Sequence, residues 1–330
     1  MKGKVLGFDI GNYSLKIAVI VNGSIKQFIT EKIPDNTVRD DTVSNFEVMA
    51  DFIKTVLKDN KIKIKNAALT LSGNAVYTKA DAVLPLMTAE RLKVNLPYEF
   101  RDYLSGDKND YIYDYMITDC VDDNLHLFAV AAPKSLIRNY QEMFERAGLN
   151  LKLIVPEYIG YMNIISTQQE KFGVVRGEKD YAVLDIGDKA IRMHFFTKGK
   201  YEITRELDFG CKTMVQAYAE QTGQDLHIAR MNIESGQTEG EAADALRESY
   251  RVASVHVMRV MNFYNFNNPN NNLDTIFYCG GGAHIKPLLD DVAENCGMKL
   301  SPFTDLMGFT DVATPDEIIA SPQSYGITLK

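Results

Sequence analysis

Short apolar runs alternate along this chain with longer segments whose apolar residues recur every three or four positions. The short runs are typical of buried strands, and the longer segments are typical of amphipathic helices that cover a sheet. Strands are predicted at 6–10, 15–21, 66–71, 76–84, 111–117, 125–132, 151–155, 182–186, 191–196 and 276–279. This alternation predicts an α/β fold in which helices cover a mixed sheet.

Helix ends are marked by residues that satisfy or interrupt the helical backbone. Ser44 is the expected N-cap of a helix whose apolar face includes Val48 and Met49. Pro133 fits the first turn of a helix that Gly148 ends. Further helices are predicted from residues 88, 156 and 285 onwards and at 211–223, 225–234 and 238–266.

The first strand reappears later in the chain as a repeat. Asp9-Ile10-Gly11 ends one apolar strand and Asp185-Ile186-Gly187 ends another, 176 residues further on. The hairpin turns that follow, Asn22-Gly23 and Lys198-Gly199, keep the same spacing and suit tight β-hairpins. A duplicated hairpin therefore predicts two related halves.

The expected halves are residues 1–155 and 156–330. Residues 73–132, approximately, do not fit the repeat and are interpreted as a small inserted α+β subdomain of the first half. Residues 211–266, approximately, form the expected helical subdomain of the second half.

The Asp-Ile-Gly turns have the composition of a phosphate site. Glycine after a strand permits a tight turn that brings N–H groups against phosphate oxygens. A carboxylate at the strand end can hold Mg²⁺ through water. One such turn is typical of a plain strand end, but two in register converge on one site if the halves pack about a pseudo-twofold axis. Asp9 and Asp185 are therefore expected to face phosphates from opposite sides.

A third glycine turn, Gly280-Gly281-Gly282, follows an apolar strand and precedes a helix. Without side chains, such a turn can pass beneath the sugar and base of a nucleotide. The candidate cofactor-binding residues are Asp9, Gly11, Asn12, Ser14, Lys16, Asp185, Gly187, Lys189, Gly210, Gly280, Gly281 and Gly282.

At these residues the chain resembles the actin–Hsp70–sugar-kinase superfamily. DIGNYSLK, from Asp9 to Lys16, is similar to its first phosphate motif, and DIGDKAIR, from Asp185 to Arg192, to its second. Residues 278–284 are similar to its adenosine motif. Within the superfamily the chain most resembles the PilM family of type IV pilus assembly proteins, a relative of the division protein FtsA. This narrower resemblance lies in residues 69–78, 84–87, 127–134, 144–149 and 323–327 and in the inserted subdomain.

The resemblance implies an actin-like ATPase fold made of two duplicated ribonuclease-H-like halves. It implies ATP as ligand, Mg²⁺ held through water by Asp9 and Asp185, and Lys16 reaching the phosphates. It also implies that Glu157 orients the attacking water, although Glu157 equally fits an acid that stabilises a helix N-terminus. At most a weak ATPase is expected.

One position departs from the superfamily pattern, because the charged pair Asp188-Lys189 follows Gly187 where small residues are usual. Two interpretations follow. The extra charge weakens phosphate binding, or Lys189 contacts phosphate while Asp188 points outward.

The resemblance also implies a partner, the cytoplasmic N-terminal peptide of the membrane protein PilN. An apolar groove between the first-half core and the inserted subdomain could accept an extended peptide. Its candidate lining residues, Val83, Leu84, Leu86 and Met87, also fit an ordinary subdomain core. The implied role is a scaffold that couples nucleotide state to pilus assembly, with other pilus assembly proteins and self-association as further contacts.

Composition narrows the location and the classes of partner. The net charge of −8 and the lack of a basic stripe give no reason to expect nucleic acid. No run approaches the ~20 apolar residues of a membrane span, and no secretory signal is recognisable. The four cysteines are scattered, which indicates a reducing compartment. A cytoplasmic protein is expected, which reaches the inner face of the cytoplasmic membrane only through partners.

Two other functions fit parts of the pattern. A small-molecule kinase of the same superfamily would need a general base and a larger acceptor-binding insert. An FtsA-like division protein should end in an amphipathic membrane helix, but the final residues ASPQSYGITLK are polar. The five histidines show no metal-ligand spacing.

Overall fold

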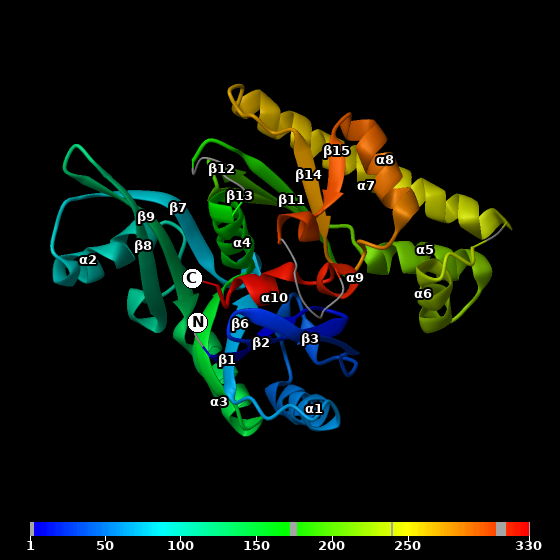
Figure 1. Cartoon of the computed structure of the whole chain (residues 1–330), viewed down its shortest axis with the longest axis horizontal. Helices are drawn as coiled ribbons and strands as arrows, with labels where there is room; N and C mark the ends of the chain where they lie inside the picture. The colour runs from blue at the N-terminus through cyan, green and yellow to red at the C-terminus, as the bar shows by residue number, and fades with distance from the viewer. Residues whose placement is uncertain (1–2, 172–176, 239, 308–314, 330) are drawn as a thin grey trace.

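The computed structural model describes residues 3–171, 177–238, 240–307 and 315–329. Two five-stranded sheets face each other, with helices α4 (Glu157–Lys171) and α10 (Pro322–Gly326) between them (Figure 1). A smaller three-stranded sheet lies beside them.

The two large sheets have the same topology. The first has the order β10-β6-β1-β2-β3 and the second the order β15-β14-β11-β12-β13, read in the matching direction. In each sheet, three consecutive antiparallel strands precede two strands that continue the sheet in parallel. The strands are β1 (Lys4–Ile10), β2 (Ser14–Val21), β3 (Ser24–Lys32), β6 (Asn66–Leu71), β10 (Asn150–Pro156), β11 (Tyr181–Ile186), β12 (Ile191–Thr197), β13 (Lys200–Leu207), β14 (Thr275–Cys279) and β15 (Lys299–Pro302).

The two predicted hairpin turns are present. Asn22 and Gly23 have φ values of 53° and 83°, and Lys198 and Gly199 have 53° and 75°. Positive φ at both central residues gives the turn a twist that matches that of the flanking strands. The duplicated hairpin in the sequence thus corresponds to a duplicated unit in space.

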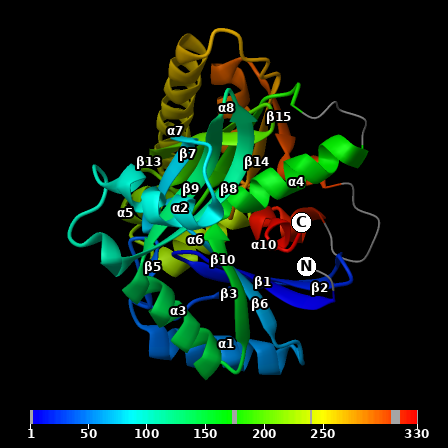
Figure 2. The same cartoon turned by 90° about the vertical axis from the view of Figure 1, so that its left-hand side faces the viewer.

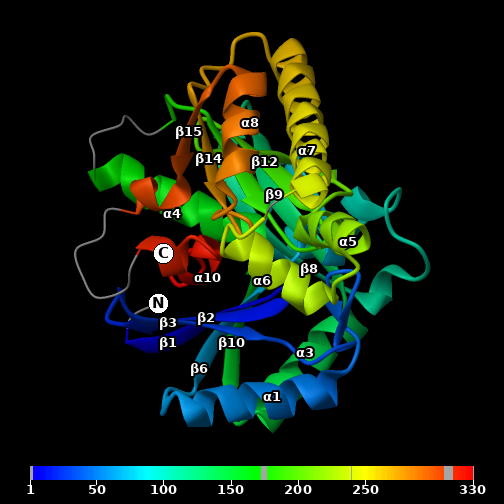
Figure 3. The ribbon, with the colours of Figure 1, turned by 90° about the vertical axis from the view of Figure 1, so that its right-hand side faces the viewer.

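Helices cover the outer face of each sheet (Figure 3). Those of the first sheet are α1 (Phe46–Asp59) and α3 (Lys134–Arg146). The second half carries α5 (Cys211–Thr222), α6 (Leu226–Glu234), α7 (Gly240–Asn267) and α8 (Lys286–Cys296). The remaining short elements are β4 (Val38–Arg39), β5 (Thr42–Val43), α9 (Pro315–Ile318) and the 3-10 helices Gly73–Ala75, Leu96–Phe100, Lys108–Asp110 and Phe303–Leu306.

The start of α1 differs from the prediction by one residue. Asn45, not Ser44, is the N-cap, because its side chain accepts a hydrogen bond from the backbone N–H of Val48. Val48 itself is 41% exposed and does not belong to the apolar face of the helix. Two neighbouring residues of good capping type compete here, and the chain direction at the helix start selects between them.

The inserted subdomain is a sheet of order β7-β9-β8 with one covering helix (Figure 2). Its elements are β7 (Tyr77–Pro85), α2 (Ala89–Asn95), β8 (Tyr111–Val121) and β9 (Asn124–Pro133). It has its own core, which includes Leu84, Leu92, Phe100 and Leu127.

The polar segment near residue 320 lies in the middle of the molecule. Helix α10 packs so closely against β1 and α4 that a Cβ on Gly7 would meet the carbonyl oxygen of Ser324 at 1.7 Å. A Cβ on Gly160 would meet Gln323 Cα at 2.7 Å. Backbone contact of this kind brings Gln323 to the space between the halves. In the described part of the chain, no helix combines the length and apolar character that crossing a membrane requires.

Candidate functional site

The two Asp-Ile-Gly turns open into one cavity of about 720 Å³ between the halves. Most of the residues predicted from sequence line it. They are Asp9, Gly11, Asn12, Ser14, Lys16, Glu157, Asp185, Gly187, Lys189, Gly280 and Gly281.

Two predicted glycines, Gly210 and Gly282, lie outside that set and support the turns from behind. A Cβ on Gly210 would come within 2.4 Å of the Asp188 carbonyl oxygen. A Cβ on Gly282 would come within 2.3 Å of Ile186 Cγ2. Glycine at both places allows the second turn to pack tightly against its neighbours.

The two turns are built alike. The N–H of Gly11 donates to the carbonyl of Ser14 at 3.1 Å, and the N–H of Gly187 donates to the carbonyl of Ala190 at 3.0 Å. Asp9 pairs with Lys16 across β1 and β2, and residue 185 pairs with residue 192 across β11 and β12. An acidic residue therefore lies beside a basic one at the same place in each half.

Two side chains from distant parts of the chain contact the Asp9 carboxylate. Lys16 Nζ lies 3.3 Å from Asp9 Oδ2. Gln323 Nε2 donates to the same oxygen at 3.3 Å from helix α10. Both contacts use Oδ2 of the carboxylate.

Asp185 is more deeply buried. The Tyr161 hydroxyl donates to Asp185 Oδ2 at 3.0 Å. Burial raises the pKa of Asp185, Arg192 opposes this, and the negative charge of Asp9 raises it further. Asp9 and Asp185 both line the cavity.

Glu157 is the first residue of α4, is buried and lines the cavity. Burial raises its pKa well above the ordinary carboxyl value, and Asp185 and Asp9 add to this, whereas Arg192 lowers it. Its Oε1 lies 3.8 Å from Arg192 Nε and 3.5 Å from the N–H of Gly73. Both interpretations of Glu157, water-orienting acid and helix-end acid, fit this position.

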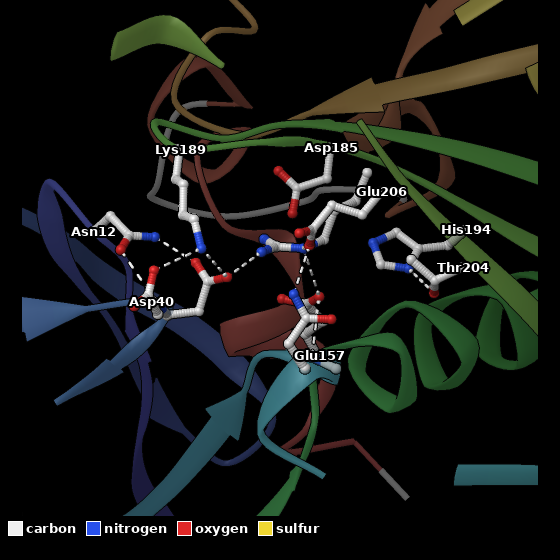
Figure 4. Close-up of polar contacts among 12 residues, drawn as sticks. Asn12, Asp40, Glu157, Asp185, Lys189, His194, Thr204 and Glu206 are labelled. Atoms are coloured by element: carbon white, nitrogen blue, oxygen red, sulfur yellow. Dashed lines mark hydrogen bonds and ion pairs between the residues drawn. The ribbon is translucent and has the colours of Figure 1, made fainter. Parts of the chain in front are cut away.

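Ion pairs connect the halves, and of the residues that form them only Lys189 is among the candidate site residues predicted from sequence. Arg192 Nη2 lies 2.7 Å from Asp41 Oδ2, and Lys189 Nζ lies 3.2 Å from Asp40 Oδ1. Figure 4 shows Lys189 reaching down toward Asp40 and Asn12 from the opposite side. Arg192 could have been found in the sequence, because it follows Lys16 by the repeat spacing of 176 residues. No such signal marks Asp41.

A second bridge involves Arg230 of helix α6. Its guanidinium pairs with Asp188 and lies 3.9 Å from the ring centroid of Tyr13, which belongs to the first turn. Asp188 therefore binds Arg230 and does not project into solvent, and both Asp188 and Lys189 line the cavity.

The residues present fit a magnesium–nucleotide ligand. Ser72 Oγ and Gln323 Oε1 are buried without a hydrogen-bond partner, and both residues line the cavity. Within the described ranges, no group of three or more histidine, cysteine or acidic side chains could hold a metal alone. Asp9 and Asp185 could hold Mg²⁺ only together with water and phosphate oxygens, which is the usual mode for this ion.

Comparison with known proteins gives the same architecture. A family model described as type IV pilus assembly protein PilM matches residues 7–321. A solved structure titled PilM-PilN type IV pilus biogenesis complex is 18% identical with a TM-score of 0.81, and the match covers 100% of this chain and 98% of that one.

More distant structures share the fold. Ethanolamine utilization protein EutJ from Carboxydothermus hydrogenoformans is 13% identical with a TM-score of 0.62, and the match covers 99% of this chain and 90% of that one. MreB5 of Spiroplasma citri bound to AMPPNP is 9% identical with a TM-score of 0.54, over 99% and 96% of the two chains. The predicted actin-like α/β fold is confirmed.

Proposed function

Because this chain belongs to the PilM family of type IV pilus assembly proteins, we propose that it is an ATP-binding, actin-like scaffold of the pilus assembly machine. Its ligand is ATP with Mg²⁺. Asp9 and Asp185 hold the ion through water, Lys16 contacts phosphate, and Gly280 and Gly281 leave room for the adenosine. The family membership does not favour the small-molecule kinase or the division protein.

One observation carries the nucleotide proposal. The two Asp-Ile-Gly turns end matching strands of two sheets with the same topology, and both line one cavity. Each turn offers backbone N–H groups and a carboxylate, which together suit phosphate and a hard cation.

The charge of the cavity supports a magnesium complex in preference to free nucleotide. Among the described residues that line it, nine are acidic and five are lysine or arginine. Such a surface repels a bare triphosphate. A divalent cation between the carboxylates and the phosphates offsets this repulsion.

Binding, more than turnover, is the proposed role of the nucleotide. Glu157 with a raised pKa carries a proton over more of the neutral range than an ordinary carboxyl group. A protonated carboxyl cannot accept a proton from an attacking water. The chain is therefore at most a weak ATPase, in which bound nucleotide clamps the halves in one arrangement.

The proposed partner is a PilN-type cytoplasmic peptide, as in the complex that the similar structure contains. Of the four predicted groove residues, Leu84 belongs to the subdomain core and Met87 packs against that core. Val83 and Leu86 are 47% and 57% exposed, so they remain the candidates for peptide contact. Through this partner the protein would lie at the inner face of the cytoplasmic membrane.

Thermal unfolding with and without ATP and Mg²⁺ tests the nucleotide proposal. The melting temperature of the wild type should rise with the ligand, because a ligand that binds only the folded state stabilises it. Asp9→Asn should lose most of this rise. The control is Asp59→Asn, at an exposed acid of α1, which should keep it. An unchanged wild-type melting temperature at millimolar ATP and Mg²⁺ would count against the proposal.

Fluorescence anisotropy with a labelled PilN-type N-terminal peptide tests the partner separately. Leu86→Asp should weaken peptide binding while the nucleotide shift persists. Phe266→Asp is a matched control, since Phe266 is an apolar residue of the other half with 84% exposure. Equal peptide binding by wild type and Leu86→Asp would remove the groove assignment.

A further inference from the structure

Arg192 occupies the place in the second half that Lys16 occupies in the first. The two residues are 176 positions apart, like the two aspartates beside them. In the strand register, Asp9 is opposite Lys16 and Asp185 is opposite Arg192. Both basic side chains line the cavity. The duplication therefore gives each half one cation next to its aspartate.

Three carboxyl groups surround the Arg192 guanidinium. Its Nη2 lies 2.7 Å from Asp41 Oδ2, and its Nε lies 2.7 Å from Glu206 Oε2 and 3.8 Å from Glu157 Oε1. Glu206 is the residue opposite Arg192 in the β12–β13 pair, and Glu157 begins α4. Asp41 comes from the first half, between β4 and β5. Arg192 is thus held on one side by its own half and on the other by a residue that crosses the cleft.

Asp41 lies at the tip of a two-residue hairpin between β4 and β5. Asp40 and Asp41 have φ values of 49° and 61°, a backbone conformation that aspartate adopts more readily than most residues. The side chain of Asp41 is only 5% exposed. A short hairpin thus inserts a carboxylate into the space between the halves.

The surroundings of that carboxylate resemble an anion-binding site. Besides Arg192, Lys189 Nζ lies 3.8 Å from Asp41 Oδ2. The side-chain amide of Asn12, in the first phosphate turn, donates to Asp41 Oδ1, and the Asp41 N–H donates back to Asn12 at 3.4 Å. A guanidinium, an ammonium and an amide therefore converge on one anionic group, and two of them belong to the predicted phosphate turns.

We propose that Arg192 is a phosphate-binding residue and that Asp41 is its built-in competitor, a carboxylate that holds the phosphate position until nucleotide displaces it. The inference rests on the proposed nucleotide binding and adds the regulation of the same site. Carboxylate and phosphate both pair with guanidinium through two oxygens, so one can replace the other. The displaced hairpin tip is short and close to solvent, since Asp40 is 80% exposed.

Competition of this kind has a measurable consequence. The apparent affinity for nucleotide is the intrinsic affinity multiplied by the fraction of molecules in which Asp41 has left the cations. Asp41→Asn keeps the shape and the Asn12 contact but removes the charge that pairs with Arg192. The substitution therefore raises the affinity for ATP, an unusual outcome for a change inside a binding site.

Isothermal titration with ATP and Mg²⁺ tests the proposal on the full chain. Asp41→Asn should bind about tenfold more tightly than wild type, the factor expected for one charge-assisted hydrogen bond. Asp59→Asn, at an exposed acid of α1 away from the cavity, is the control and should change the affinity by less than about twofold. The gain should require Arg192, so the double variant Asp41→Asn/Arg192→Gln should bind no more tightly than Arg192→Gln alone. Without nucleotide, Asp41→Asn should also melt at a lower temperature, because the link between the halves is lost.

The outcomes separate this inference from the nucleotide proposal. If Asp41→Asn binds ATP no more tightly than wild type, Asp41 is not a competitor for the phosphate position. If Asp9→Asn still abolishes the binding seen in wild type, the nucleotide site itself is supported. No binding by any variant, Asp41→Asn included, would overturn both. Misfolding cannot imitate the expected result, since it is a gain of affinity.

Discussion

Tyr161 orients Asp185 from the helix that joins the two halves. Its hydroxyl donates to Asp185 Oδ2 at 3.0 Å, and both residues are buried at the centre of the molecule. Cys279 Sγ, at the end of β14, lies 3.4 Å from the same hydroxyl. The second aspartate of the site is therefore fixed by α4, the element that contacts both sheets.

Removing this hydroxyl should affect stability and ligand binding together. Tyr161→Phe leaves the buried Asp185 carboxylate short of one donor, which should lower the free energy of unfolding by about 1–3 kcal/mol. The affinity for ATP and Mg²⁺ should fall as well, because the carboxylate loses its fixed orientation. Urea unfolding and calorimetric titration measure the two effects.

Tyr325→Phe is the matched control, because the Tyr325 hydroxyl donates to the carbonyl of Gly23 away from the cavity. It should keep the wild-type affinity. Unaltered affinity in Tyr161→Phe as well would show that the hydrogen bond to Asp185 has no part in binding.

Arg230 should support nucleotide binding by neutralising the charge of Asp188. Arg230→Ala leaves the Asp188 carboxylate, 14% exposed, unpaired beside the second turn. The added negative charge should weaken nucleotide binding about tenfold, or ~1.4 kcal/mol. The double variant Arg230→Ala/Asp188→Asn should recover most of the loss, since it removes the same charge. A double variant as weak as the single one would contradict this electrostatic explanation.

One added methyl group should affect stability at Gly280 but nucleotide binding at Gly281. Gly280 has a φ of 96°, and its added Cβ would lie 2.4 Å from Asp185 Oδ1. Gly280→Ala should therefore destabilise the protein by about 1–3 kcal/mol. Gly281 faces open space, so Gly281→Ala should keep the wild-type melting temperature while weakening nucleotide binding. Unchanged binding in Gly281→Ala would argue against a nucleotide passing over this turn.

His194 should make the stability depend on pH. Burial first, and Arg192 second, lower its pKa to about 3, and Nε2 has no hydrogen-bond partner. The unfolded chain binds the proton near pH 6.5 and the folded chain does not, so stability is full above that pH and falls as the pH drops toward 3. The loss attributable to His194 should be about 1.4 kcal/mol per pH unit.

Urea unfolding between pH 7.5 and 5 measures this slope. His194→Gln should flatten it, whereas His227→Gln, at an exposed position of α6, should leave it unchanged. Parallel curves for wild type and His194→Gln would refute the buried neutral histidine.

Local pattern and repetition account for much of what could be predicted. Most of the longer strands, the two hairpin turns and both phosphate turns follow from periodicity of apolar residues and from the 176-residue spacing, whereas β3, β13 and β15 were not predicted. These features depend on residues close together in the sequence. The N-cap of α1 was wrong by one residue because Ser44 and Asn45 both have capping side chains.

The residues that sequence reasoning missed depend on contacts between distant segments. Asp41 meets Arg192 from 151 positions away, and Gln323 meets Asp9 from 314 positions away. Helix α10 is polar, so its pattern indicates a surface, yet close backbone packing against Gly7 and Gly160 places it at the centre. Only the assembled halves bring these side chains to the cavity.

The central claim is that Asp9 and Asp185 form one magnesium–nucleotide site, and calorimetric titration with ATP tests it most directly. The account predicts one ATP bound per wild-type chain with Mg²⁺ and much weaker binding when EDTA removes the ion. Asp9→Asn and Asp185→Asn should each weaken binding at least about tenfold. Binding that is indifferent to Mg²⁺, or that survives loss of either carboxylate unchanged, would contradict the account.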